Sequence, residues 1–198
     1  MSENRMESIL NNSSSFGKLN AILFFKASQI YFEIIYKDIL SLFQPTEINS
    51  SLFDLKNMEM KEIDISVPQI QSQNSIMKII FSKKIEKIIL ECYNGHFIIE
   101  HLFKSDEIHN VSGYSVIEKY HNQNSNSILV IGYELSINID HYEESLKENI
   151  TDISLHPIFV AKNIGGKFEI NEYISNNSTV NEQKIKSIRE YLKAINIS

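Results

Sequence analysis

Residues 91–100 read ECYNGHFIIE and contain the dipeptide Asn94-Gly95 between two runs rich in apolar and aromatic residues. An Asn-Gly pair in this setting is the strongest short-range signal for a two-residue β-hairpin, because a type I′ turn requires positive φ angles at both central residues. The sequence therefore predicts an antiparallel hairpin made of strands 84–93 and 96–103. Once the turn is fixed, the register of the two strands is fixed with it.

This register decides how the only cysteine is interpreted. It pairs Tyr93 with His96 and Cys92 with Phe97, so Cys92 and His96 lie on opposite faces of the hairpin. Cys92 falls among apolar residues on a core face that also carries His101. We interpret Cys92 as a small buried hydrophobic residue, because a reactive thiol needs an exposed, electropositive setting. The alternative is a reactive thiol or a metal ligand.

The other face of the hairpin mixes acidic, aromatic and aliphatic side chains. Glu91 and Glu100 flank Tyr93 and His96 on this face. Aromatic residues combined with a few charges are typical of protein interfaces, so we predict a partner-binding patch. The acidic–aromatic patch, as we call it, consists of Glu91, Tyr93, His96 and Glu100. The alternative is an amphipathic sheet face whose apolar members are covered by a helix.

Length and composition favour one acidic domain inside a cell. The 198 residues are enough to bury a core without a disulfide or a metal ion. The net charge of −6 disfavours a phosphate-binding surface, and Arg5 and Arg189 are the only arginines, so nucleic acid is not an expected partner. A single cysteine forms no internal disulfide, which fits a cytoplasmic protein.

The segment 16–44 is the most apolar part of the chain and is predicted to form one long helix. Its polar residues fall on one narrow stripe at helical spacing, and Pro45 would end the helix. Charged residues interrupt the segment, leaving no run near the roughly 20 uncharged residues that a bilayer requires, so no membrane association is expected. A helix this apolar would pack on its own sheet or form a homo-oligomer with a second copy. Residues 1–15 are expected to be a flexible tail, and 16–198 a single domain.

Further elements complete the predicted fold. We expect a strand at 76–81, a weaker strand at 114–120, an inner strand at 127–139, a short helix from Asp140 to Ile150, a hairpin at 157–174 around Gly165-Gly166, and a helix that starts near Asn181. Phe159, Ala161, Phe168 and Ile170 should share one face of the second hairpin. The predicted fold is α+β, with a long apolar N-terminal helix and a C-terminal helix packed on an antiparallel sheet of about six strands.

The sequence contains no recognised linear signature of catalysis. It lacks the G-x-S-x-G nucleophile elbow and the glycine-rich phosphate-binding loops. His96, His101 and His109 lie near one another, but the first two point to different strand faces, so no shared metal site is expected. We therefore predict no catalytic residue, no metal and no cofactor.

The leading hypothesis is a non-enzymatic intracellular protein that binds another protein. An inhibitor, an immunity-type protein, a chaperone or an accessory subunit would each fit, and the acidic patch would suit a basic partner. One alternative is a hydrolase or transferase whose site combines histidines and carboxylates. Another is a structural or assembly subunit of a phage particle or a secretion complex.

Overall fold

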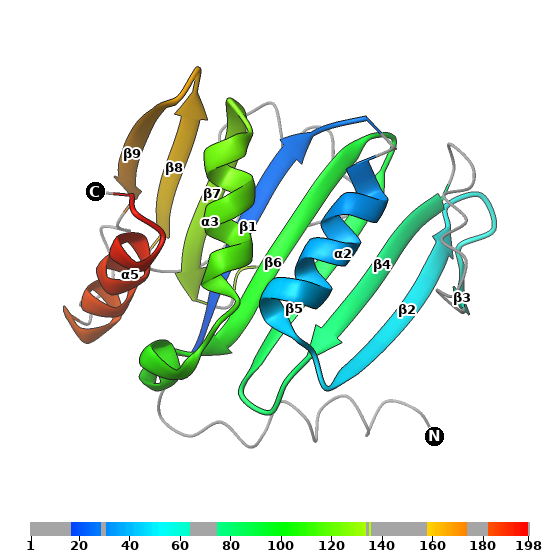
Figure 1. Cartoon of the computed structure of the whole chain (residues 1–198), viewed down its shortest axis with the longest axis horizontal. Helices are drawn as coiled ribbons and strands as arrows, with labels where there is room; N and C mark the ends of the chain where they lie inside the picture. The colour runs from blue at the N-terminus through cyan, green and yellow to red at the C-terminus, as the bar shows by residue number, and fades with distance from the viewer. Residues whose placement is uncertain are drawn as a thin grey trace.

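A computed structural model describes the chain over residues 17–28, 31–63, 75–133, 135, 158–173 and 182–197. Within these residues the fold is mixed α+β, with one antiparallel sheet of nine strands (Figure 1). The α+β class is therefore confirmed, but the sheet is larger than the predicted six strands. No helix in the described ranges is long and apolar enough to cross a bilayer.

The elements follow one another along the chain as strands with a few helical insertions. The strands are β1 (Lys18–Lys26), β2 (Glu47–Asp54), β3 (Glu59–Glu62), β4 (Ser75–Ser82), β5 (Glu86–Tyr93), β6 (His96–Lys104), β7 (Asn126–Tyr133), β8 (Ile158–Ile164) and β9 (Lys167–Tyr173). The helices are α2 (Tyr31–Phe43), the 3₁₀ helix η1 (Ser105–Asn110), α3 (Tyr114–Gln123) and α5 (Glu182–Ala194). The strand order across the sheet is β3-β2-β4-β5-β6-β1-β7-β8-β9.

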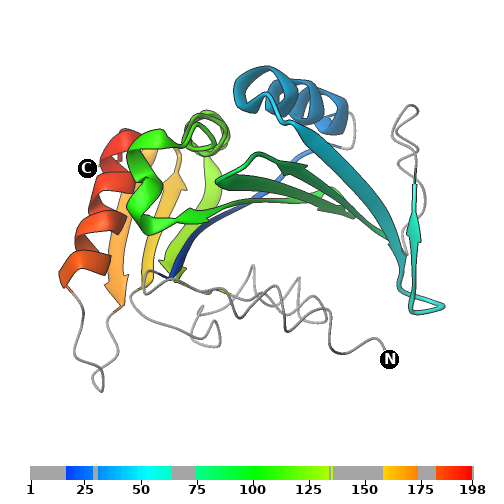
Figure 2. The ribbon, with the colours of Figure 1, turned by 90° about the horizontal axis from the view of Figure 1, so that it is seen from below.

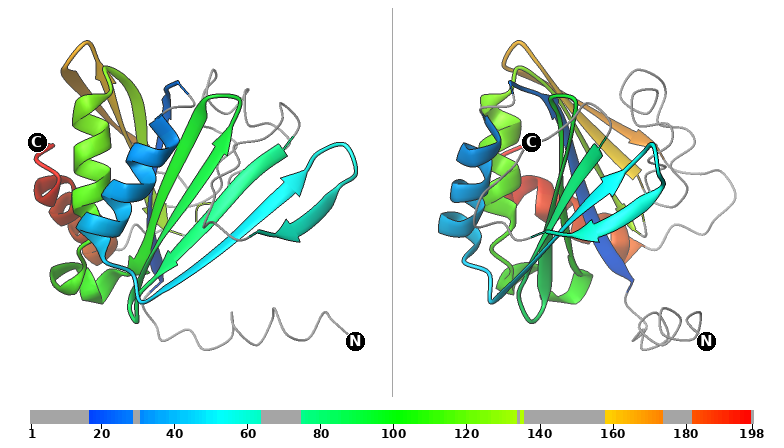
Figure 3. Two further views of the ribbon diagram at one scale, coloured as in Figure 1. Left: turned by 45° about the vertical axis from the view of Figure 1, so that its right-hand side comes forward. Right: turned by 90° about the vertical axis from the view of Figure 1, so that its right-hand side faces the viewer.

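The sheet is curved, and the described helices lie on its convex side (Figure 2). The right-hand view of Figure 3 shows α2 and α3 together on that side of the strands. We call this side the helix face; it carries the main core, with Leu23, Leu90 and Ile99 fully buried against the helices. The opposite face holds a smaller buried cluster that includes Ile22 and Val130. β1 and β7 thus bury apolar residues on both faces.

β1 is where structure and prediction differ most. Residues 16–44 do not form one long apolar helix, because the first part of the segment is β1 and only Tyr31–Phe43 is helical. β1 pairs with β6 on one side and with β7 on the other, and its successive residues Ile22 and Leu23 are buried on opposite faces. A strand buried on both faces reads as a continuous apolar run, which periodicity alone does not separate from a buried helix. No helix spanning 16–44 is present to form the predicted contact between copies.

The predicted strand at 114–120 is also wrong, because these residues belong to α3. Its buried side chains are Val116, Ile117, Tyr120 and His121, which follow helical spacing and face the sheet. β-branched and aromatic residues favour strands. Here, however, β1 already pairs with β7, and the apolar side chains of 114–120 pack as a helix over the sheet. The weak local preference is overridden by packing.

Both hairpin predictions are confirmed. Asn94 and Gly95 have φ angles of 47° and 77°, and the register pairs Tyr93 with His96 and Cys92 with Phe97. In the second hairpin Ala161 pairs with Ile170, which places Phe159, Ala161, Phe168 and Ile170 on one face. The C-terminal helix is confirmed as α5. The expected tail 1–15 and the expected helix 140–150 lie outside the described residues.

Candidate functional site

Three side chains with catalytic-type chemistry meet on the helix face. Glu86 opens β5, His101 lies on β6, and Tyr191 comes from α5. The Nε2 atom of His101 is 2.9 Å from Oε2 of Glu86, and its Nδ1 atom is 2.9 Å from the hydroxyl of Tyr191. We call these residues the buried triad. They connect two strands to the last helix.

Glu86 also accepts hydrogen bonds at the start of α3. Its carboxylate accepts the backbone N–H of Ser112 at 3.0 Å, that of Gly113 at 2.9 Å and the Ser112 hydroxyl at 2.9 Å. Burial alone would raise the pKa of Glu86, but the bonds from His101, Gly113 and Ser112 outweigh it and lower the pKa to about 2. A carboxylate at a helix N-terminus also interacts favourably with the helix dipole. Glu86 is therefore a buried anion with its bonding capacity filled.

The protonation state of the triad follows from its surroundings. Burial lowers the pKa of His101, against the opposing pull of Glu86, so the ring is neutral at pH 7. A neutral ring donates from Nε2–H to Glu86 and accepts at Nδ1 from the Tyr191 hydroxyl, whose own pKa burial raises. Each hydrogen-bond donor between the three residues of the buried triad therefore faces an acceptor.

The triad is closed to solvent. A carboxylate, an imidazole and a hydroxyl in series resemble the relay that activates a nucleophile in hydrolases. Here, however, His101 and Tyr191 are 0% exposed and Glu86 is 3% exposed. A Cβ atom on Gly113 would lie 2.5 Å from two atoms of the His101 ring, so even a methyl group does not fit beside it. The triad holds β5, β6, α3 and α5 together.

The sequence alone identified only one member of this triad. His101 was placed on the core face by its register, whereas Glu86 and Tyr191 lie 15 and 90 residues away from it along the chain. The signal that would have found Glu86 is its position two residues before Ile88 and four before Leu90, on the apolar face of β5. A charged residue at an inward position requires a buried partner.

The acidic–aromatic patch lies on the opposite face of the sheet. The register places Glu91 beside Ile98, and Glu100 beside Ile89, so both glutamates project from that face. Glu91 forms an ion pair with Lys78 at 2.8 Å, and Glu100 accepts a hydrogen bond of 2.5 Å from Asn20 Nδ2. These four residues make a polar row across β4, β5, β6 and β1.

This polar row is largely buried. Glu91 is 9% exposed and Asn20 is 5% exposed. Burial raises the pKa of Glu100, and the bond from Asn20 and the charge of Lys78 only partly oppose that rise. Within the described part of the chain, Oδ1 of Asn20 has no hydrogen-bond partner. The polar row is therefore less completely satisfied than the triad.

The aromatic members of the patch lie at its rim. Tyr93 and His96 flank the turn at Asn94-Gly95 and are half-buried. Tyr93 packs against the apolar cluster of the opposite face. The structure thus brings the four predicted residues to one face, where Glu91 is buried and Glu100 is half-buried. Contact of this patch with a partner stays a prediction.

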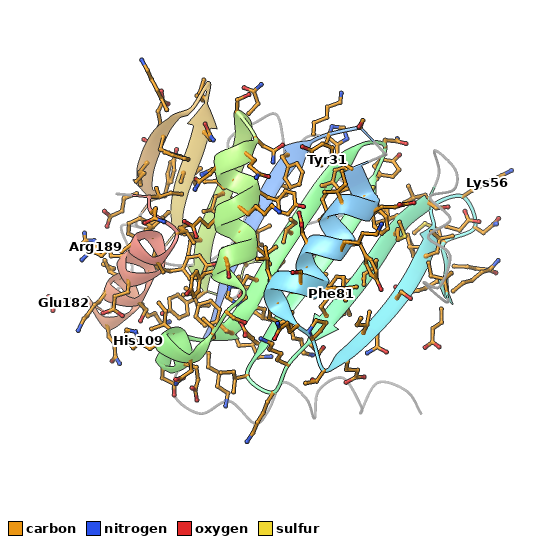
Figure 4. All side chains as sticks on the ribbon, viewed as in Figure 1. Tyr31, Lys56, Phe81, His109, Glu182 and Arg189 are labelled. Atoms are coloured by element: carbon orange, nitrogen blue, oxygen red, sulfur yellow. The ribbon has the colours of Figure 1, made fainter. Side chains whose placement is uncertain are left out.

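Among the described residues, His96, His101 and His109 do not gather into one site. His101 is on the helix face, His96 is at the start of β6, and His109 is exposed on η1 (Figure 4). No group of three or more His, Cys, Asp or Glu side chains in the described ranges could hold a metal ion. Cys92 is 5% exposed, and burial raises its pKa to about 11, so it is a buried apolar residue as predicted.

The β8–β9 hairpin carries exposed apolar side chains at the rim of the sheet. Ile164, Phe168, Ile170 and Tyr173 are 50%, 38%, 38% and 52% exposed. β9 is the last strand in the order, and none of its seven residues is buried. Figure 1 shows β9 at one rim of the sheet and β3 at the other. This edge was predicted as part of a hairpin, but not as a binding surface.

Polar contacts hold the tip of this hairpin against the body of the protein. Asn163 donates a hydrogen bond of 2.7 Å to the carbonyl oxygen of His121 and accepts one of 2.9 Å from the Gly166 N–H. The Gly165 N–H donates to the carbonyl oxygen of Ser125 at 2.8 Å. The Phe168 ring also lies 5.2 Å from the ring of His121. These contacts fix the position of the β8–β9 hairpin relative to α3 and the loop that follows it.

Comparisons of the chain with models of known protein families, with characterised proteins and with solved structures find no match. The chemistry of the sites described above is therefore the basis for a functional proposal.

Proposed function

We propose that this protein acts by binding other protein chains, and that the outer edge of β9 is the surface it uses. An edge strand presents a row of N–H and C=O groups that can pair with an added strand. In the described residues, β9 pairs with β8 on one side only. The observation that carries the proposal is this seven-residue edge with exposed Phe168 and Ile170 beside it.

The composition of β9 supports this role. Natural proteins usually protect such edges with charged side chains, proline, bulges or very short strands. β9 carries the charged residues Lys167, Glu169 and Glu172, but it lacks the other devices. β9 contains no proline, and its pairing with β8 runs without a bulge from Ile158–Tyr173 to Ile164–Lys167. β9 presents Phe168 and Ile170, together with Glu172, on the helix face, and three polar residues with Tyr173 on the other. Backbone bonds would give affinity, and the alternate side chains would give specificity.

The buried polar groups also favour binding over catalysis. The members of the triad are closed to solvent, and the Ser127 hydroxyl near His121 is 1% exposed. Burial lowers the pKa of His121 to about 4, so this second histidine is a neutral side chain that joins α3 to β7. Groups without access to a substrate stabilise the fold instead of reacting with one.

A capture experiment with the wild type and two matched variants tests the proposal. The full-length wild type is used as bait in an extract of its source cells, next to Ile170→Lys on β9 and Met60→Lys on the opposite edge strand β3. Both replaced side chains are exposed, at 38% and 69%, so both variants should keep the fold. We expect the protein captured by the wild type to be lost with Ile170→Lys and kept with Met60→Lys.

The same experiment separates the edge from the acidic–aromatic patch. The combined variant Glu91→Gln, Tyr93→Ser, His96→Ser, Glu100→Gln changes the patch and leaves β9 intact. Loss of capture in this variant alone, while the variant remains folded, would move the proposed binding surface to the patch and reject β9. Capture that survives all of these changes would contradict both surfaces. Circular dichroism confirms that each bait is folded.

A further inference from the structure

We propose that the strand added to the β9 edge is β9 of a second copy of this chain, paired antiparallel about a two-fold axis at Ile170. This inference rests on the proposed function, because it names the occupant of the same edge. It would join two nine-stranded sheets into one continuous sheet. The argument uses the backbone directions, the register and the charges of β9.

The backbone directions come from the hairpin turn. Gly165 and Gly166 have φ angles of 61° and 85°, as in a type I′ turn, and Ile164 pairs with Lys167 next to it. In a two-residue hairpin this first pair exchanges hydrogen bonds, and the bonded pairs then alternate along the ladder. Lys167, Glu169, Asn171 and Tyr173 therefore bond inward to β8. The N–H and C=O groups of Phe168, Ile170 and Glu172 point outward.

A two-fold axis at Ile170 matches all of these outward groups. It brings Ile170 opposite its own copy and brings Phe168 opposite Glu172 of the second copy. These three pairs can form about six backbone hydrogen bonds, two for each bonded pair. Symmetric antiparallel pairing also keeps both helix faces on the same side of the joined sheet. All seven residues of β9 take part.

The charges of β9 favour this axis over its neighbours. With the axis at Ile170, Lys167 lies opposite Tyr173 and Glu169 lies opposite Asn171, so no two like charges are directly opposed. An axis at Glu169 would place two glutamates opposite each other, which destabilises a strand pair. An axis at Asn171 would leave Lys167 and Phe168 without a partner inside β9. Ile170 is therefore the centre with full overlap and no charge conflict.

The position of α5 is compatible with the pair. Arg189 on α5 lies 3.6 Å from Glu172, which places the helix beside the C-terminal end of β9 (Figure 4). In the antiparallel pair the two Glu172 residues are separated by four positions along the strands, or roughly 13 Å. The two copies of α5 therefore lie toward opposite ends of the joined edge.

The contact is short, so we expect a weak dimer. One strand pair buries less surface than the roughly 1,200–2,000 Å² of a standard stable interface. The protein should therefore pass from monomer to dimer as its concentration rises, instead of forming a permanent dimer.

Sedimentation velocity of the full chain tests the inference. Over a concentration series from micromolar to near millimolar, the wild type should move from its monomer mass of 22.9 kDa toward twice that value. Ile170→Lys and Ile170→Glu should each remain monomeric, because each places like charges at the axis. An equal mixture of the two should dimerise again, since opposite charges then meet there. Met60→Lys serves as the control and should behave as the wild type.

Three results would overturn the inference. The first is a wild type that is monomeric at every concentration, and the second is a dimer that Ile170→Lys leaves intact. The third is a mixture of the two charge variants that stays monomeric, which rejects the axis at Ile170. If the wild type is monomeric while Ile170→Lys still loses the captured protein, β9 binds a different partner. The proposed function then stands without self-pairing.

Discussion

Two carboxylates on opposite faces of the same sheet behave in opposite ways. Glu86 and Glu100 come from neighbouring central strands; Glu86 is 3% exposed and Glu100 is half-buried. The pKa of Glu86 falls to about 2, whereas that of Glu100 rises. Burial acts in the same direction on both groups, so the difference comes from their hydrogen-bond donors and from neighbouring charges, among which Glu91 raises the pKa of Glu100 further.

The number of donors explains the contrast. Glu86 accepts hydrogen bonds from the His101 ring, from two backbone N–H groups at the start of α3 and from the Ser112 hydroxyl. It also forms an ion pair with Lys83 at 3.6 Å. Glu100 receives the side-chain amide of Asn20. The helix face thus contains a buried anion that stabilises the fold, and the opposite face contains one whose charge is poorly compensated. The difference teaches that burial alone does not fix the role of a carboxylate.

Removal of the Glu86 carboxylate is the change with the largest expected effect. Glu86→Ala would leave His101, Ser112 and Gly113 with buried donors and no acceptor. We expect a loss of about 3–5 kcal/mol in the free energy of unfolding, measured by urea denaturation. Asp106→Ala, an exposed acid on η1, is the control and should change stability by less than about 0.5 kcal/mol. Equal effects of the two changes would contradict the role given to the triad.

A methyl group beside the His101 ring should have the next largest effect. Gly113→Ala places a Cβ atom 2.5 Å from that ring, which is fully buried and has no room to move. We expect a loss of about 1–3 kcal/mol from overpacking, measured by thermal or urea unfolding. In a His101→Ala background the same change should cost much less, because the clash is gone. A cost that is the same in both backgrounds would show that the strain lies elsewhere.

The smallest expected effect is a difference between Glu86 and Glu100 in how their contributions to stability depend on pH. The pKa of Glu86 is lowered from 4.5 to about 2, so its contribution is present above pH 4.5 and is lost as the pH falls toward 2. The stability difference between wild type and Glu86→Gln should therefore shrink over that window.

Glu100 has the opposite sign. Because its pKa is raised, its contribution is present below pH 4.5 and is lost as the pH rises through the folded-state value. Glu100→Gln should therefore stabilise the protein at pH 7, by up to about 1 kcal/mol. Urea titrations of both variants between pH 3 and pH 8 measure the two trends. Parallel trends would mean that the surroundings stabilise the ionised forms of the two carboxylates equally.

Local signals in the sequence predicted the turns but not the central strand. Asn94-Gly95 and Gly165-Gly166 specify their hairpins through the φ angles that these residues tolerate, so register and facing followed without further information. The apolar run of β1 predicts a helix, because its two buried faces remove the alternation that identifies a strand. The strands that β1 pairs with lie far away along the chain, and local periodicity carries no information about them.

The candidate sites show the same division. The facing of Glu91 and Glu100 follows from the turn, and so does that of His101. Their environments depend on Asn20, Lys78 and Tyr191, which come from other elements. The β9 edge depends on strand order, because a strand becomes an edge only when the sheet ends there. Short-range pattern therefore located side chains, and tertiary packing decided what each can do.

The central place of β1 has a consequence for how the protein is made. β1 is synthesised first among the described strands, yet it pairs with β6 and β7, so Leu19 meets Phe103 and Tyr133. Until the ribosome has translated those later residues, this strand, which is buried on both faces, has no partner. Such long-range closure slows folding and leaves the emerging chain prone to aggregation. Chaperones that bind nascent chains should therefore bind Lys18–Lys26 before the sheet closes around it.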